Sequence, residues 1–271
     1  MSLTLTFWGV RGSIPTPQAG RLGFGGNTTC LELRWPGEPA LIIDAGTGVR
    51  SLGLRLAQEA HRKVNVFLSH FHWDHIQGLP FFAPLYGAEW EVAVHSAVDP
   101  ARSQDVLAAQ IARPCFPAGE AIRARQTFHQ MRTEGVQAGA LRVRPFPLFH
   151  PGGATGYRVD APGASVVYAC DHEHGDREGD LSVRRAAEGA DVLLYDASYT
   201  PAEYGKKRGW GHSTWLEAAR AARDAGVKEL VLFHHDPERD DEEVKRIVDD
   251  ARGEFGAVRG AREGDRIILP G

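Results

Sequence analysis

The sequence has few cysteines and no long apolar run. Its three cysteines, Cys30, Cys115 and Cys170, are odd in number, far apart and without CxxC spacing, which indicates a reducing compartment. No segment approaches the roughly 20 consecutive apolar residues that a membrane helix needs, and Met1 to Val10 lacks the basic start and long apolar stretch of an export signal. We therefore expect a cytoplasmic protein with no membrane association.

An excess of positive charge is also absent. Lys and Arg total 31 against 35 Asp and Glu, a formal net charge of -4, whereas a chain that binds by neutralising many phosphates is usually basic. This balance disfavours extended nucleic acid as a partner. What is present, 42% hydrophobic residues and 31 glycines in 271 residues, is typical of a globular chain that can bury a sizeable core.

Short β-branched and aromatic runs predict strands, and several are apolar throughout, so both faces of the sheets are expected to be covered. The predicted strands are 3–8, 30–33, 40–43, 64–68, 91–95, 141–143, 165–168, 192–195, 229–233 and 266–269. The predicted helices are 51–60, 100–112, 121–131, 181–188, 214–225 and 242–252.

Helix ends are best marked in the C-terminal third. Thr214 and Glu217 have capping-box spacing and Gly226 follows the last turn, while Asp240 provides an acidic start for the next helix and Gly253 its expected stop. Strands that pair by short turns, followed by alternating strands and helices, favour a layered α/β sandwich. No repeat or proline-rich linker divides the chain, so we expect one domain over 1–271, with 96–140 as an insertion over one edge.

The most informative segment follows the predicted strand 64–68. After Ser69 come His70, His72, Asp74 and His75, four metal-ligand side chains in an HxHxDH pattern. On an extended segment the first two histidines point the same way, and the other two side chains follow as the chain turns, so one loop can supply two adjacent metal ions. The alternative is a polar surface loop with chance histidines, and four donors directly after a buried strand argue against it.

The HxHxDH pattern resembles the signature of the metallo-β-lactamase superfamily, and further motifs follow in the order of that family over most of the chain. The run 41–48 (LIIDAGTG) resembles its strand and glycine turn. His150 matches its third histidine, Asp171 its bridging carboxylate and His234 its last histidine. The resemblance implies an α/β fold of the four-layer αββα sandwich type.

The resemblance also implies a centre with two divalent metal ions. The expected ligands are His70, His72 and His150 for one metal, Asp74, His75 and His234 for its neighbour, and Asp171 bridging both. An anionic bridge is needed because two dications about 3.5 to 4 Å apart repel strongly. Nitrogen and oxygen ligands suit zinc, which is the expected metal, with manganese or iron as alternatives.

Neighbouring side chains leave alternatives open at two of these positions. Cys170 precedes Asp171 and offers a thiolate, but we expect it to point to the other side of the strand. His235 adjoins His234, and only one of the two can face the metals. The resemblance favours His234.

Two further positions resemble the acid and histidine motifs of ribonuclease Z, a branch of the superfamily. In that branch a histidine oriented by a carboxylate protonates the leaving alkoxide, which is a strong base. Here His212 would be the acid and Asp196, in place of the usual glutamate, its partner; a helix-start residue and a strand-end cap are the alternatives. In ribonuclease Z a long tRNA-binding arm lies between the third histidine and the bridging aspartate. Here only residues 151–170 separate His150 from Asp171, which leaves no room for such an arm.

These features favour a metal-dependent phosphodiesterase that hydrolyses a small phosphodiester, above all a cyclic nucleotide, with Asp74, Asp196 and His212 as catalytic residues. A metal pair lowers the pKa of bound water towards 7 and so supplies hydroxide for hydrolysis. The compact spacing is similar to that of small-molecule phosphodiesterases of the superfamily. The alternatives are a carbonyl-ester hydrolase such as a thioesterase or lactonase, a tRNA 3′-processing endonuclease, and a metalloprotein that binds nucleotides without turnover. Similar enzymes form homodimers, which we also expect here.

Several loops either contribute to substrate binding or are ordinary turns. The run from Lys206 to Trp210 has the basic and aromatic side chains to hold a phosphate and stack a base, although such runs are more often solvated loops. Glycines in 9–13 and 25–28 permit a close backbone approach to the site, and tight turns explain them equally well. His172 and His174 are expected to be solvated loop residues.

Overall fold

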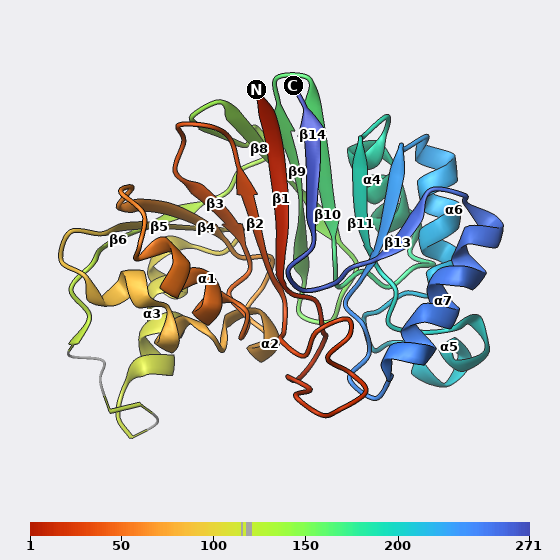
Figure 1. Cartoon of the computed structure of the whole chain (residues 1–271), viewed down its shortest axis with the longest axis horizontal. Coiled ribbons are helices and arrows are strands. Elements are labelled where there is room, and N and C mark those ends of the chain that lie inside the picture. Colours follow the sequence, from red (N-terminus) through yellow and green to blue (C-terminus); the bar gives the residue numbers. More distant parts are fainter. Residues whose placement is uncertain (115, 118–120) are drawn as a thin grey trace.

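Two seven-stranded sheets pack face to face in the computed structural model, which describes residues 1–114, 116–117 and 121–271 (Figure 1). The N-terminal sheet has the order β14-β1-β2-β3-β4-β5-β6. Its strands are β1 (Ser2–Gly9), β2 (Cys30–Arg34), β3 (Ala40–Ile43), β4 (Lys63–Phe67), β5 (Glu91–Ser96), β6 (Arg125–Gln130) and β14 (Arg266–Pro270).

The second sheet has the order β13-β12-β11-β10-β9-β8-β7. Its strands are β7 (Val136–Ala138), β8 (Leu141–Leu148), β9 (Ala154–Ala161), β10 (Ala164–Ala169), β11 (Val192–Asp196), β12 (Glu229–Phe233) and β13 (Val258–Gly260). The strands from β7 to β10 pair antiparallel, and those from β10 to β13 pair parallel.

Helices cover the outer face of each sheet, which confirms the expected four-layer αββα sandwich (Figure 1). Outside the N-terminal sheet lie α1 (Val49–Leu56) and α3 (Pro100–Ile111), and outside the second sheet lie α4 (Arg177–Ala187), α6 (Trp215–Ala225) and α7 (Asp241–Glu254). The connecting loops contain α2 (Trp73–Ile76), α5 (Pro201–Lys207) and the 3-10 turns η1 (Leu79–Phe81) and η2 (Ala83–Tyr86).

The strands β3, β10 and β11 are buried along their whole length, because each sheet is covered on both faces there. In β11, Leu194 packs into the core between the two sheets, whereas its neighbour Leu193 packs against α4 and α6 on the outer side. Both side chains are fully buried. Alternate residues of one strand therefore serve two different cores, as expected for parallel strands covered by helices.

The helix ends agree with the sequence signals. The hydroxyl of Thr214 accepts a hydrogen bond from the Glu217 amide, and Gly226 ends α6 with a φ of 64°, where a side chain would be strained. Asp240 and Glu243 form a reciprocal capping box at the start of α7. Gly253 does not stop this helix, which continues to Glu254.

The predicted helix over residues 121–131 is wrong. The structure has β6 there, which pairs parallel to β5 and places His129 beside His95. The strand itself (RQTFHQ) has one large apolar side chain, Phe128, so an edge position satisfies it. Within 96–140, the described residues form α3, β6 and β7. The sequence also failed to predict β7, β9, β13, α2 and α5.

The structure shows the state of two cysteines and whether any described helix could span a membrane. Cys30 and Cys170 are free and buried, and Cys115 lies outside the described residues. No helix in the described part of the chain is long and apolar enough to cross a membrane.

The parallel strands determine where loops gather. In the N-terminal sheet β3, β4 and β5 run in one direction, and in the second sheet so do β10, β11 and β12. Asp196 is the last residue of β11, and the segments that follow the other strands contain Asp44, His70, Asp171 and His234. Carboxyl ends of parallel strands are the usual place for functional loops in α/β proteins, and here both sheets direct theirs to one region.

Candidate metal centre

Sharp turns follow three of these strands. Asp44, Asp171 and His234 have φ values of 60°, 58° and 59°, in the left-handed region that residues with a side chain rarely adopt. Ser13, with a φ of 63°, is the remaining non-glycine residue of this kind in the described part of the chain. Such strain is held only where the surrounding structure enforces it, and it gathers at functional sites.

A first cluster brings the HxHxDH loop together with residues that lie much later in the sequence. Ligand atoms of His70, His72, His150 and Asp171 all lie within 4.8 Å of one another. Nε2 of His150 is 3.1 Å from Nδ1 of His72, and Nε2 of His70 is 3.7 Å from Oδ2 of Asp171. The three histidines that the sequence assigned to one metal are thus brought together.

A second cluster lies on the other side of Asp171. It contains Asp74, His75, Asp171 and His234, all buried. Oδ1 of Asp171 is 3.2 Å from Nε2 of His75 and 3.3 Å from Nε2 of His234, which itself lies 3.2 Å from Oδ2 of Asp74. One oxygen of Asp171 therefore faces each cluster, the arrangement that a bridging ligand requires.

The donor atoms fit a pair of divalent cations. Nε2 of His70 and Nε2 of His75 are buried and have no hydrogen-bond partner, which is costly unless a cation accepts their lone pairs. Burial opposes charging of His75, yet the carboxylates of Asp171 and Asp74 outweigh it and raise its pKa well above the usual value. The cluster thus attracts positive charge, and its nitrogen and oxygen atoms are the donors that zinc and similar ions prefer.

Asp44 orients the second cluster, a role that the sequence reading missed. Its Oδ2 lies 2.7 Å from Nδ1 of His75 and accepts hydrogen bonds from Tyr168 at 2.7 Å and from Ser69 at 2.8 Å. A carboxylate only accepts, so Nδ1 of His75 carries the proton and leaves Nε2 free as a ligand. The sequence did contain one signal for this role. Asp44 directly follows the buried strand β3, much as His70 follows β4 after a short gap.

Glu173 plays a similar part for the first cluster. Its carboxylate accepts hydrogen bonds from the amides of Gly209 and Gly211, each at 2.7 Å. The carbonyl of Gly211 in turn accepts from Nδ1 of His150 at 2.8 Å. The loop after α5 is thereby fixed so that Nε2 of His150 faces the other ligands.

Asp196 and His212 form a direct pair beside the second cluster. Oδ2 of the buried Asp196 lies 2.8 Å from Nδ1 of His212, so the shorter aspartate reaches its partner. The His212 ring stacks on His234 with centroids 4.8 Å apart. Burial lowers the pKa of His212, but the Asp196 carboxylate outweighs it and raises the pKa to about 9. The Asp196 carboxylate therefore favours the protonated form of this histidine.

His234, and not His235, contributes to the clusters. Nε2 of His235 donates to the carbonyl of Ala261 at 2.9 Å, so this ring packs away from the clusters. His172 was expected to be solvated, which is wrong: it is fully buried and bonded to Asp180 at 3.0 Å.

Cys170 also departs from expectation, because its thiol does not point away from the site. Sγ donates to Oδ1 of Asp171 at 2.9 Å. Burial, reinforced by the neighbouring Asp171 charge, raises the pKa of this thiol well above its usual value. Cys170 thus serves as a hydrogen-bond donor to Asp171, and its Sγ also lies within 4.8 Å of ligand atoms of Asp171, Asp196 and His234.

The early glycine loop is both a tight turn and a part of the site. The Ser13 amide donates to Oδ2 of Asp74 at 2.8 Å, and a methyl group on Gly12 would lie 2.3 Å from Cε1 of His234. Arg11 is fully buried and donates to the carbonyls of Gly25, Asp236, Arg239 and Arg21. This guanidinium ties the loop to the segment after β12 that carries His234.

Gly12→Ala is expected to displace the His234 ring and to lower the metal content of the second cluster. Loss of ligand orientation typically costs about 10- to 100-fold in metal affinity or activity. Elemental analysis of the purified protein measures the metal bound per chain. The matched control is Gly253→Ala in α7, where the new methyl group meets no atom within 4 Å. Equal metal content in both variants would contradict the expectation.

The basic and aromatic run after α5 is folded on itself. Lys207 Nζ lies 4.3 Å from the Trp210 ring centroid and 5.6 Å from that of Tyr199, and Arg208 lies over Tyr204 at 5.7 Å. Trp210 remains 59% exposed. The cations of this run thus contact aromatic rings of the same region.

The two sheets, the outer helices and the paired His/Asp clusters at the strand ends define a protein of the metallo-β-lactamase fold. A family model described as "Beta-lactamase superfamily domain" matches residues 40–235, and the chain belongs to this superfamily. Its class is that of metal-dependent hydrolases.

Relatives extend over nearly the whole chain. An uncharacterised protein of Mycobacterium leprae is 31% identical over 277 residues, covering 99% of this chain and 89% of its own length. Ribonuclease Z of Natronomonas pharaonis is 28% identical over 320 residues, covering 100% of this chain and 99% of its own length.

Solved structures show the same fold. A metallo-beta-lactamase fold protein from Bacillus subtilis has a TM-score of 0.77 at 20% identity and covers 98% of this chain and 99% of its own. A diphosphatase from the PhnP family has a TM-score of 0.72 at 20% identity, with 98% and 97% covered.

Proposed function

We propose that the chain is a metal-dependent phosphodiesterase that hydrolyses a small phosphodiester, in the first place a cyclic nucleotide. The observation that carries the proposal is the Asp196–His212 pair, stacked on His234 of the second cluster. A thioester expels a thiolate, which is a weaker base than an alkoxide and has less need of such an acid, whereas a lactone expels an alkoxide and is distinguished by the substrate panel below. The similarity to ribonuclease Z, an enzyme whose name denotes phosphodiester cleavage, supports the same class.

The proposed ligands are those that the two clusters bring together. They are His70, His72 and His150 for one metal, Asp74, His75 and His234 for the other, and Asp171 for both. When bound, a metal pair supplies an activated water and polarises the phosphoryl oxygens. Zinc suits this donor set best, and manganese or iron fits it too.

The chain's own residues then handle the protons. Asp74, fixed by the Ser13 amide, is placed to accept a hydrogen bond from the attacking water. His212 donates the proton on Nε2 to the leaving oxygen, while Asp196 holds Nδ1 and stabilises the charged ring. Solvent returns the proton to His212 after the alcohol has left, because the side chain is 13% exposed.

The short segment between His150 and Asp171 supports a small substrate. Between His150 and Asp171 the chain forms only the β9–β10 hairpin, with no arm that could grip a large RNA. The formal net charge of -4 also disfavours a polyanion. A small diester needs neither an arm nor a basic surface.

The test is a substrate panel on the purified protein, with elemental analysis of the metal it carries. We expect hydrolysis of 3′,5′-cyclic nucleotides and of bis(p-nitrophenyl) phosphate, loss of activity after chelation, and recovery with zinc, manganese or iron. Thioesters, lactones and precursor tRNA complete the panel. Turnover of a thioester or lactone without any diester hydrolysis would overturn the phosphodiesterase proposal, as would tight nucleotide binding with no product.

A further inference from the structure

A cavity of about 600 Å³ opens beside His70 and His72, the first two histidines of the metal centre. Its wall comes from the HxHxDH loop, α3, β8 and the segments after β5, β6 and β8. Apolar side chains dominate this wall: Phe71, Val98, Val106, Met131 and Phe146. The volume lies within the range of about 300 to 1,000 Å³ that small-molecule sites occupy.

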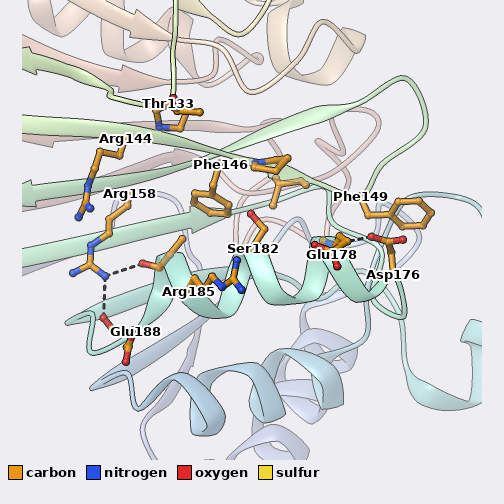
Figure 2. A pocket seen from close by; sticks show the side chains of 15 residues that line it. Thr133, Arg144, Phe146, Phe149, Arg158, Asp176, Glu178, Ser182, Arg185 and Glu188 are labelled. Atoms are coloured by element: carbon orange, nitrogen blue, oxygen red, sulfur yellow. Dashed lines mark hydrogen bonds between the residues drawn. The ribbon is translucent and has the colours of Figure 1, made fainter.

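A larger cavity of about 730 Å³, between β8 and α4, has a different character (Figure 2). None of the seven proposed metal ligands lines it. Two of the three arginines that line it are already paired: Arg158 donates to the carbonyls of Ala186 and Glu188, and Arg144 pairs with Asp160 at 2.7 Å. The smaller cavity adjoins His70 and His72 and is therefore the better candidate for a substrate.

The smaller cavity offers few free hydrogen-bonding groups. The hydroxyls of Ser96 and Ser103 are 2.9 Å apart and bond to each other. Arg102, on α3, lines the cavity, and across the described ranges its guanidinium has no hydrogen-bond or ion-pair partner. The site therefore combines apolar faces with one uncommitted planar cation.

We propose that this cavity binds the nucleobase of a cyclic nucleotide whose phosphodiester lies at the metal centre. The inference rests on the proposed phosphodiesterase function. His70 and His72 belong both to the first cluster and to the cavity wall, so the rest of a molecule held at the centre extends into the cavity. A flat ring matches apolar walls, and guanidinium groups stack on such rings. An aliphatic chain would fill the space but would leave Arg102 without a partner.

The main test compares a cyclic nucleotide with a ribose 3′,5′-cyclic phosphate that lacks the base. Val106→Trp fills the cavity and is expected to lower kcat/KM for the nucleotide by about tenfold or more, the effect of losing one stacked base. The abasic ester should be hydrolysed within about twofold of the wild-type rate, because the change leaves the centre intact. Adenosine, which has no phosphate, should inhibit the wild type competitively and lose this effect in the variant.

Two further variants keep the test decisive. Arg102→Met changes an exposed side chain and is expected to weaken adenosine inhibition even if Val106→Trp folds poorly. Ala109→Trp adds the same bulk on an exposed position of α3 outside the cavity wall and should leave all three measurements unchanged.

The outcomes separate the two proposals. Unchanged adenosine inhibition and nucleotide kinetics in both cavity variants would overturn the nucleobase site while leaving the phosphodiesterase function standing. A wild type that hydrolyses no diester would overturn the function. Calorimetry with adenosine would then still measure whether the cavity binds a base, and a preference for acyl thioesters would identify an aliphatic occupant instead.

Discussion

Asp171→Ala is expected to abolish the paired metal site and to lower kcat/KM by about a thousandfold or more, since the anion between two dications is lost. The physical reason is the position of the carboxylate, with Oδ1 at 3.2 Å from His75 and Oδ2 at 3.7 Å from His70. Without it, two cations would repel across a buried space that screens them poorly. Elemental analysis and kinetics on the cyclic nucleotide measure both effects.

A matched control for this change is Asp180→Ala. Asp180 accepts a hydrogen bond from His172 in the same region of the chain but belongs to neither cluster. It should keep its metals and lose no more than a few-fold in rate. An Asp171→Ala protein that retains two metals per chain and wild-type activity would exclude Asp171 as the bridge.

His212→Ala is expected to slow hydrolysis of a cyclic nucleotide by about 10²- to 10⁴-fold, the usual contribution of a general acid. The leaving group there is an alkoxide, which needs a proton. Bis(p-nitrophenyl) phosphate expels a much weaker base, so its rate should fall by less than about tenfold. The ratio of the two losses, measured on the same preparations, reports proton donation independently of metal binding.

Asp196→Asn is a second test of the same role, and His174→Ala is the control. Asp196→Asn removes the charge that holds Nδ1 of His212 and should reproduce the leaving-group dependence. His174 bonds to Ser213 outside the two clusters, and its replacement should spare both substrates. Equal losses on the two diesters after His212→Ala would show that His212 supports the metal site rather than the leaving group.

The HxHxDH loop could be predicted from the sequence because its four ligand-type residues lie close together in the chain. His70, His72, Asp74 and His75 fall within one short segment after an apolar strand, and a strand followed by a turn places such side chains on one edge. His150, Asp171 and His234 were harder, since nothing in their immediate neighbours identifies them. They were predicted from their order along the chain and from their positions after strands. In the structure, their ligand atoms lie within 4.8 Å of those of the HxHxDH residues in the same cluster.

Residues that act through other residues were not predictable in the same way. Asp44 and Glu173 contribute only by holding His75 and the loop beside His150, so their role exists in three dimensions and leaves no pattern of spacing. The orientation of Cys170 was misjudged for a related reason. Alternation along a strand fails once the backbone enters the left-handed turn at Asp171.

The misassigned segment 121–131 illustrates the limit for the fold. Its residues form β6 at the edge of the N-terminal sheet, where pairing with β5 decides the structure. A polar edge strand lacks the apolar alternation that marks a half-buried strand, and its pairing partner lies 34 residues earlier. The same dependence on a partner explains why β9 and β13 were missed.

The buried guanidinium of Arg11 also determines when the site can be completed. Its carbonyl partners in Asp236 and Arg239 lie 225 and 228 positions further along the chain. Contacts of such separation form late in folding, and during synthesis the N-terminal half leaves the ribosome first. The loop with His70 and His75 therefore emerges long before His234 can join it. The second cluster can accordingly be completed only after residue 234 has been synthesised and the segment that Arg11 holds has folded.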